Sequence, residues 1–148
     1  MNKTRLFWQQ YGPYLAFCVA LSAMLGSLYY SEVVGFVPCT LCWYQRILMY
    51  PLTLISLVGI LKQDEYLPNY ILPFSVIGIG VSTYHYLIQV GVLPHPSACT
   101  IGVPCNAQYV HYFGFVTIPF MALTAFILIT GLMLFTKRAD EDESLSNI

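Results

Sequence analysis

Four apolar stretches, each close to the ~20 residues that a helix needs to cross a lipid bilayer, dominate this chain of 148 residues. They cover residues 14–30, 43–61, 70–90 and 113–135. Charged residues make up only 9% of the chain, whereas about a quarter is usual for a soluble domain. We therefore expect an all-α membrane protein, a four-transmembrane-helix bundle that forms a single domain over residues 1–148.

The positive charges predict the orientation of this bundle. The connections at residues 31–42 and 91–112 contain no Lys or Arg. Basic residues lie instead before the first stretch, between the second and third stretches, and after the last stretch. They are Lys3, Arg5, Lys62, Lys137 and Arg138. Because cytoplasmic loops are enriched in Lys and Arg, we expect both termini to be cytoplasmic and the two connections to be outer loops. There is no basic patch of the kind that binds nucleic acid.

Small residues and prolines predict some of the helix geometry. Small residues spaced four apart let transmembrane helices approach closely, and two such pairs occur, Ser22 with Gly26 and Gly78 with Ser82. Pro13 suits a helix start. Pro51 and Pro119 fall inside apolar stretches, where neighbouring helices can satisfy the backbone groups that a proline frees.

Five cysteines carry the chemistry that the sequence suggests. Cys18 lies inside the first stretch and is expected to be a small buried hydrophobic residue. Cys39 and Cys42 form a Cys-x-x-Cys pair where the second stretch begins, and Cys99 and Cys105 form a second pair in the last outer loop. A helix N-terminus favours a thiolate. Because Arg46 lies one turn beyond Cys42, we expect Cys42 to be the more reactive sulfur of its pair.

Three interpretations of the two pairs are open from the residues. A four-cysteine zinc site needs such pairs, but the chain has no second Cys-x-x-Cys and no pair of histidines to strengthen it. Structural disulfides would hold the outer loops together, although a Cys-x-x-Cys ring is too small to stabilise a fold by much. A disulfide relay is favoured, because strained and exposed disulfides are the labile, catalytic ones.

The run Pro38-Cys39-x-x-Cys42-x-x-Gln45-Arg46, at the start of the second of four spans, resembles the disulfide-bond formation protein B (DsbB) family. The short second pair is most similar to the Gram-positive type called BdbC. The resemblance implies a quinone-dependent protein-disulfide (thiol) oxidoreductase. Such an enzyme reoxidises an extracytoplasmic thioredoxin-fold dithiol oxidase (DsbA/BdbD-like) and passes the electrons to the membrane quinone pool, menaquinone or ubiquinone, in support of disulfide bond formation in exported proteins.

The resemblance also implies roles for individual residues. Two redox-active disulfides, Cys39–Cys42 and Cys99–Cys105, are expected. Cys99 is the sulfur that the partner attacks, Cys105 then exchanges with Cys39, and Cys42 delivers electrons to the quinone beside Arg46. His85, in a segment that resembles the quinone-lining part of the third span, is the expected hydrogen-bond donor to the quinone.

One departure from the family pattern concerns the second pair. Only residues 100–104 separate Cys99 from Cys105, a shorter ring than in the best-known members, which affects the expected order of exchange. We expect the flanking His95 and His111 to be exposed loop residues and a short surface helix to form near Tyr109.

We therefore expect an enzyme in the cytoplasmic (plasma) membrane of a bacterium, with its active cysteines on the outer face and no metal. The alternative is a structural or assembly membrane protein in which the disulfides only stabilise loops. The two differ in one observation, because only the enzyme should co-purify with a quinone and show thiols that cycle.

Overall fold

A computed structural model describes residues 3–94, 96–99, 102–107, 109–110, 113 and 115–146. These residues form four long helices and two short helical turns, which are α1 (Lys3–Leu28), η1 (Tyr29–Val33), α2 (Thr40–Lys62), α3 (Leu67–Gln89), η2 (Ser97–Cys99) and α4 (Ile118–Ser146). All four long helices are long and apolar enough to cross a membrane. The prediction of an all-α membrane protein with four spanning helices is confirmed.

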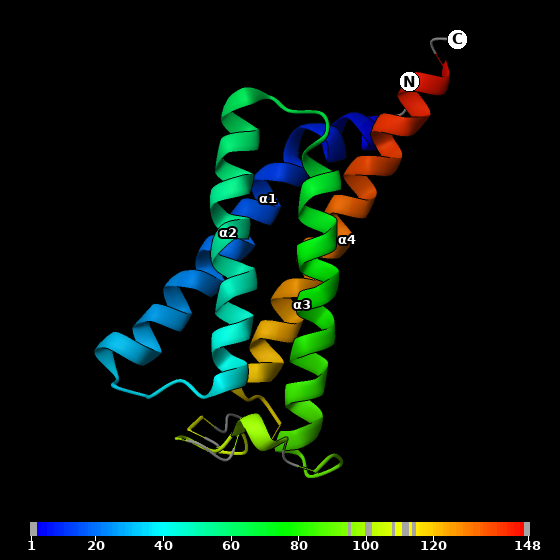
Figure 1. The fold of residues 1–148 in the computed structure, drawn as a ribbon. Helices are drawn as coiled ribbons and strands as arrows, with labels where there is room; N and C mark the ends of the chain where they lie inside the picture. The colour runs from blue at the N-terminus through cyan, green and yellow to red at the C-terminus, as the bar shows by residue number, and fades with distance from the viewer. Residues whose placement is uncertain are drawn as a thin grey trace.

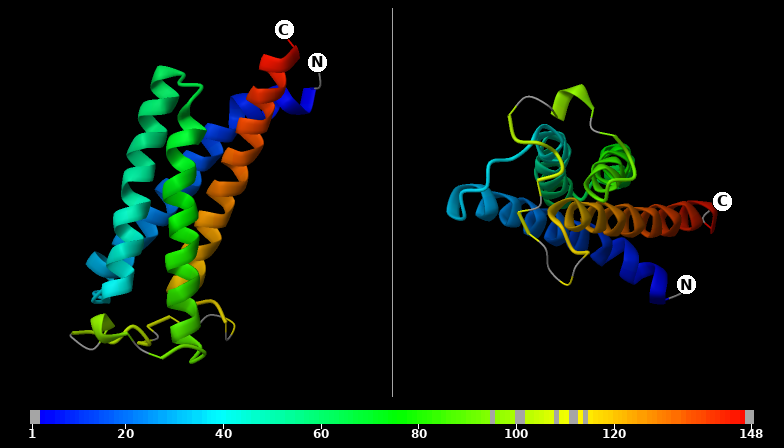
Figure 2. Two further views of the ribbon diagram at one scale, coloured as in Figure 1. Left: turned by 45° about the vertical axis from the view of Figure 1, so that its right-hand side comes forward. Right: turned by 90° about the horizontal axis from the view of Figure 1, so that it is seen from below.

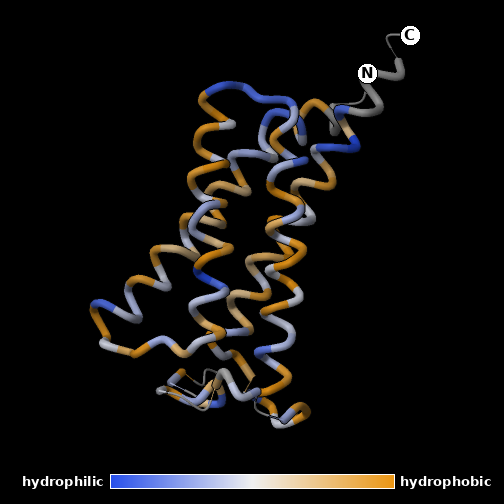
Figure 3. Tube along the Cα trace, viewed as in Figure 1, coloured by the Kyte–Doolittle hydropathy of each residue, from blue (hydrophilic) through white to orange (hydrophobic). Residues whose placement is uncertain are grey.

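The helices pack in a ring in which α1 contacts α2 and α4, and α3 contacts the same two helices. Figure 1 shows α2 and α3 side by side, with α1 and α4 crossing behind them at a tilt. Both ends of the chain lie at the end of the bundle that holds the α2–α3 connection, and η2 lies at the other (Figures 1 and 2). Hydrophilic residues concentrate at the α2–α3 connection (Figure 3). This arrangement agrees with cytoplasmic termini, which remain a prediction.

Helix ends differ from the ends of the apolar stretches. The first helix begins at Lys3, so Pro13 lies inside it rather than at its start. The last helix begins at Ile118, which makes Pro119 a first-turn residue, where a missing N–H costs no helical hydrogen bond. The short helix predicted near Tyr109 is wrong, because Tyr109 lies in a bend and the helical turn is η2. The prediction that His95 and His111 are exposed concerns two residues that lie outside the described part of the chain.

The core explains why one of the two small-residue pairs brings helices together. Phe126 of α4 is fully buried, and a Cβ added at Gly78 of α3 would clash with its ring. Ser82 is also fully buried and accepts a hydrogen bond from Gln45 of α2. Glycine and serine at this spacing therefore let α3 pack closely against both neighbours, as predicted.

A substitution at Gly78 tests this packing. Gly78→Ala should lower the free energy of unfolding by roughly 1 to 3 kcal/mol, because a methyl group would have to displace a buried ring in a filled core. Gly80→Ala is the matched control on the same helix, since nothing lies within 4 Å of a Cβ at that position. Thermal unfolding of the two variants in detergent measures the difference. Equal midpoints would contradict the close approach of α3 and α4.

Candidate redox site

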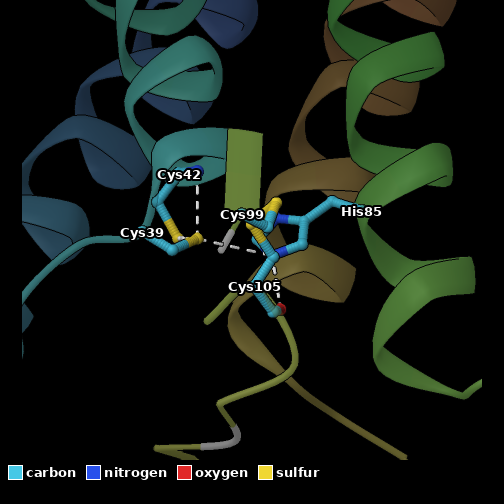
Figure 4. Close-up of a disulfide and its surroundings, with 5 residues drawn as sticks. All are labelled: Cys39, Cys42, His85, Cys99 and Cys105. Carbon is cyan, nitrogen blue, oxygen red and sulfur yellow. Dashed lines mark hydrogen bonds between the residues drawn. A yellow bond between two sulfur atoms is a disulfide. The ribbon is translucent and has the colours of Figure 1, made fainter. Parts of the chain in front are cut away.

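Two cysteine pairs that are distant in sequence share one buried cluster at the η2 end of the bundle. Cys39, Cys99 and Cys105 are all buried, together with Leu41 of α2 and Ile88 of α3, and Cys42 packs against this cluster. Figure 4 shows the two pairs close together, with the side chain of His85 reaching toward them from α3. The fold therefore brings the two pairs into one site.

The two pairs differ in their oxidation state. Cys99 and Cys105 are joined by a disulfide, as predicted. Cys39 and Cys42 are free thiols whose Sγ atoms lie 2.8 Å apart, at hydrogen-bond distance. The structure thus holds the Cys-x-x-Cys pair reduced, with its sulfurs already in contact. The pair is not exposed as the sequence analysis assumed, because Cys39 is buried and Cys42 is half-buried.

The start of α2 explains the arrangement of this pair. Cys39 is the N-cap residue, with extended backbone, and its Sγ accepts a hydrogen bond of 3.3 Å from the backbone N–H of Cys42. Hydrogen bonds from the Cys42 thiol and from His85 hold the pKa of Cys39 well below its ordinary value, in spite of the opposing effect of burial. The thiolate is therefore stabilised at Cys39, the N-cap residue of α2. The prediction that the helix start favours a thiolate at Cys42 is wrong.

His85 of α3 connects the two pairs. Its Nε2 lies 3.6 Å from Sγ of Cys39 and 3.1 Å from the backbone oxygen of Cys105. The side chain is 1% exposed, and its Nδ1 has no hydrogen-bond partner in the described part of the chain. Nε2, the ring nitrogen that has hydrogen-bond partners among the described residues, is therefore directed at the cysteines.

Arg46 and Cys42 line a separate hollow of about 200 Å³, which α1, α2, α4 and the connection between α1 and α2 enclose. The Arg46 guanidinium donates a hydrogen bond of 3.1 Å to the backbone oxygen of Ser27 and lies over the ring of Trp43. We call this hollow the Arg46 groove. Ser22 and Gly26 line it, and a Cβ at Gly26 would meet nothing within 4 Å. The prediction that this small pair brings helices into close contact is wrong.

A stack of aromatic rings lies beside the groove, and the sequence did not predict it. Tyr30 stacks on Phe36 at 6.0 Å between ring centroids, and Phe36 stacks on Tyr109 at 4.7 Å. All three line the Arg46 groove. The sequence shows only that aromatic residues flank the spans, as in interfacial belts. Their positions in the sequence do not indicate that these three rings stack on one another.

The remaining cysteine has a different position from the one expected. Cys18 is an exposed residue of α1, so the prediction of a small buried hydrophobic residue is wrong. It lies outside the cluster that contains the other four cysteines. This makes Cys18 a useful control in experiments on those four.

Comparisons with known proteins show which family the chain belongs to. Residues 9–136 match the family model described as "Disulfide bond formation protein DsbB". The chain belongs to the DsbB family. Among its relatives in this family, "Disulfide bond formation protein C" of Bacillus subtilis is 51% identical over 129 residues, which cover 84% of this chain and 91% of the relative. "Probable disulfide formation protein C" of Halalkalibacterium halodurans is 57% identical over 111 residues, 74% of this chain and 81% of the relative.

No solved structure matches this chain. Membership of the DsbB family, together with four helices able to span a membrane, makes the protein a membrane disulfide-formation protein. Its activity is that of a thiol-disulfide oxidoreductase, and the family implies a thiol oxidase as its partner.

Proposed function

We propose that this protein oxidises an extracytoplasmic thioredoxin-fold dithiol oxidase and transfers the electron pair to a membrane quinone. The observation that carries the proposal is the shared site, in which two cysteine pairs meet at His85 and Cys42 also lines the Arg46 groove. Electrons that enter at the outer loop can thus reach a groove between the helices through sulfur atoms alone.

The proposed exchange begins in the outer loop. A thiolate of the reduced partner attacks Sγ of Cys99, and the Cys99–Cys105 bond breaks with Cys105 leaving as a thiolate. Cys105 then attacks Cys39 in the oxidised Cys39–Cys42 pair, which releases the Cys42 thiolate. The second partner thiol displaces Cys99, so the partner leaves as a disulfide. Cys99 re-forms its bond to Cys105, and the Cys39–Cys42 pair, now carrying two electrons, has the oxidation state seen in the structure.

The Arg46 groove suits a quinone by its chemistry. Apolar side chains such as Met49, Met121 and Phe126 contribute to its walls, and Arg46 supplies a fixed positive charge beside Cys42. A bound quinone would accept two electrons and two protons from the reduced pair. Arg46 would hold the negative charge that develops next to Cys42, because a guanidinium carries several N–H donors and always stays charged.

We assign His85 to the exchange between the pairs. Its hydrogen bond to Cys39 favours the thiolate that leaves when the loop disulfide re-forms, and its bond to the Cys105 backbone keeps the outer loop beside α3. The expected bond from His85 to the quinone has less support, since the described residues around the groove do not include His85.

The proposed location is the cytoplasmic membrane of a bacterium, with the cysteines on its outer face. Lys62 and the chain termini lie at the end of the bundle away from the cysteine cluster (Figure 1). This arrangement follows the rule that basic residues remain in the cytoplasm.

The proposal is tested by following quinol formation with the purified full-length protein. A reduced thioredoxin-fold oxidase is the electron donor, and menaquinone and ubiquinone analogues are compared as acceptors. We expect catalytic turnover, with one quinol formed for each partner disulfide. Oxidation of the partner without quinol would contradict the quinone step, and inert thiols would support the alternative of a protein whose disulfides only stabilise loops.

The role of Arg46 is tested by changing its charge and its shape separately. Arg46→Met should raise the Michaelis constant for quinone or lower kcat/KM by roughly 10- to 100-fold, as expected for the loss of a hydrogen bond to a charged group. Arg46→Lys keeps the charge without the planar fork and should have a smaller effect. Steady-state kinetics against quinone concentration measures both. Unchanged kinetics in Arg46→Met would reduce Arg46 to an anchor for α1 through Ser27.

A further inference from the structure

Three metal-binding groups converge on one point of the site. The Sγ atoms of Cys39 and Cys42 and a ring nitrogen of His85 all lie within 4.8 Å of one another. We propose that these three residues bind one zinc ion when the Cys39–Cys42 pair is reduced, and that the bound ion blocks thiol exchange. This site needs only a reduced pair, so it stands independently of whether the electrons pass to a quinone.

The proposed site differs from the four-cysteine zinc site that the sequence left open. Cys99 and Cys105 are bonded to each other, and disulfide sulfurs are not the thiolates that zinc requires. His85, from a helix with no cysteine in it, takes their place. Two cysteines and one histidine are a known zinc ligand set that leaves a fourth position for water.

The distance between Cys39 and His85 suits tetrahedral zinc, and the two sulfurs would have to move apart. Zinc bonds of about 2.3 Å to sulfur and about 2.0 Å to nitrogen place a sulfur and a nitrogen ligand roughly 3.6 Å apart, and Sγ of Cys39 lies 3.6 Å from Nε2 of His85. The two sulfurs are 2.8 Å apart and would have to separate to roughly 3.8 Å. A rotation of roughly 35° about the Cα–Cβ bond of Cys42 moves its sulfur by about that amount, which reaches the edge of a staggered rotamer well.

A small cavity lies where the ion would sit. Its volume is about 20 Å³, and its walls include all three ligands together with Gln89, Pro104 and Ala107. One water or one ion occupies roughly 10 to 15 Å³ by this kind of measure. The cavity therefore has room for a single ion and not for an organic cofactor.

Binding is coupled to oxidation state by simple chemistry. Zinc binds Cys39 as the thiolate described above and displaces the proton of the Cys42 thiol, while the proton on Nε2 of His85 moves to the unpartnered Nδ1. No electrons move in this step. When Cys39 and Cys42 form a disulfide, both thiolate ligands are lost and the site ceases to exist. The ion thus competes with oxidation, and zinc outside the cell would hold the pair in its reduced, inactive state.

The experiment measures zinc binding by the purified full-length protein in detergent. The Cys99→Ala/Cys105→Ala double variant, reduced and then freed of reductant, isolates the proposed ligands, and zinc is titrated in competition with a chromophoric chelator. We expect one zinc per chain, at least tenfold weaker binding in His85→Ala, and no binding after the pair is oxidised. Cobalt as a probe should show thiolate-to-metal absorption, and magnesium should not compete.

The matched controls separate this site from other zinc sites. Cys18→Ser removes the free cysteine outside the cluster and should leave the affinity unchanged. His85→Gln keeps a similar volume and should lose affinity as His85→Ala does, with helix content showing that both variants fold. Zinc binding that survives in folded His85 variants, persists after oxidation, or disappears in the double variant would overturn the proposal.

Discussion

Replacing Cys42 with serine is expected to lower the rate of quinol formation by roughly 10³-fold or more, because Cys42 is the only cysteine among the described residues that line the Arg46 groove. The helix should remain folded. Serine keeps the backbone N–H that donates a hydrogen bond to Sγ of the N-cap residue Cys39 and is close to cysteine in volume, so the free energy of unfolding should change by no more than about 1 kcal/mol.

Quinone reduction by a reduced partner, followed by absorbance, measures this loss. Cys18→Ser is the control, because it removes a cysteine from α1 without touching the cluster. Quinol formation at a near-normal rate in folded Cys42→Ser would rule out the relay as proposed.

Replacing Cys105 with alanine is expected to trap the partner covalently. Cys99 is then a free thiol that exchanges with the disulfide of the oxidised partner. The partner thiol released in this exchange is alkylated as it forms, so it cannot attack the mixed disulfide and release Cys99. The complex should appear as a new band on a non-reducing gel and disappear when a reductant is added.

Cys99→Ala is the reciprocal variant and should give little or no trapped complex. If only Cys99→Ala traps the partner, Cys105 is the attacked sulfur and the order of exchange is reversed. The order of exchange depends on how far Cys105 can move from Cys99, because the ring between them is short.

The sequence was sufficient for the features that depend on local composition and spacing. Long apolar stretches predict spanning helices because a bilayer imposes a length on them, and the cysteine pairs follow from their spacing. The close approach at Gly78 was predicted in the same way. These features need no knowledge of which helix lies beside which.

Features that depend on contacts between distant residues could not be predicted in this way. His85 faces Cys39 and the Cys105 backbone because α3 packs beside the start of α2, and nothing near residue 85 in the sequence indicates this. The acceptor role of Cys39 depends on the exact residue at which α2 begins. Cys18 was misplaced because an apolar helix in a membrane carries similar residues on its lipid-facing and buried sides.

Both residues of the Cys99–Cys105 disulfide are buried, with exposed fractions of 3% for Cys99 and 1% for Cys105. A dissolved small thiol, which brings no binding energy to open the loop, therefore has almost no sulfur surface to attack. A protein partner can offset the cost of uncovering Cys99 with contacts over a larger area. In the proposed relay, burial of this bond would let the protein oxidise a protein partner while most small thiols around it are left unoxidised.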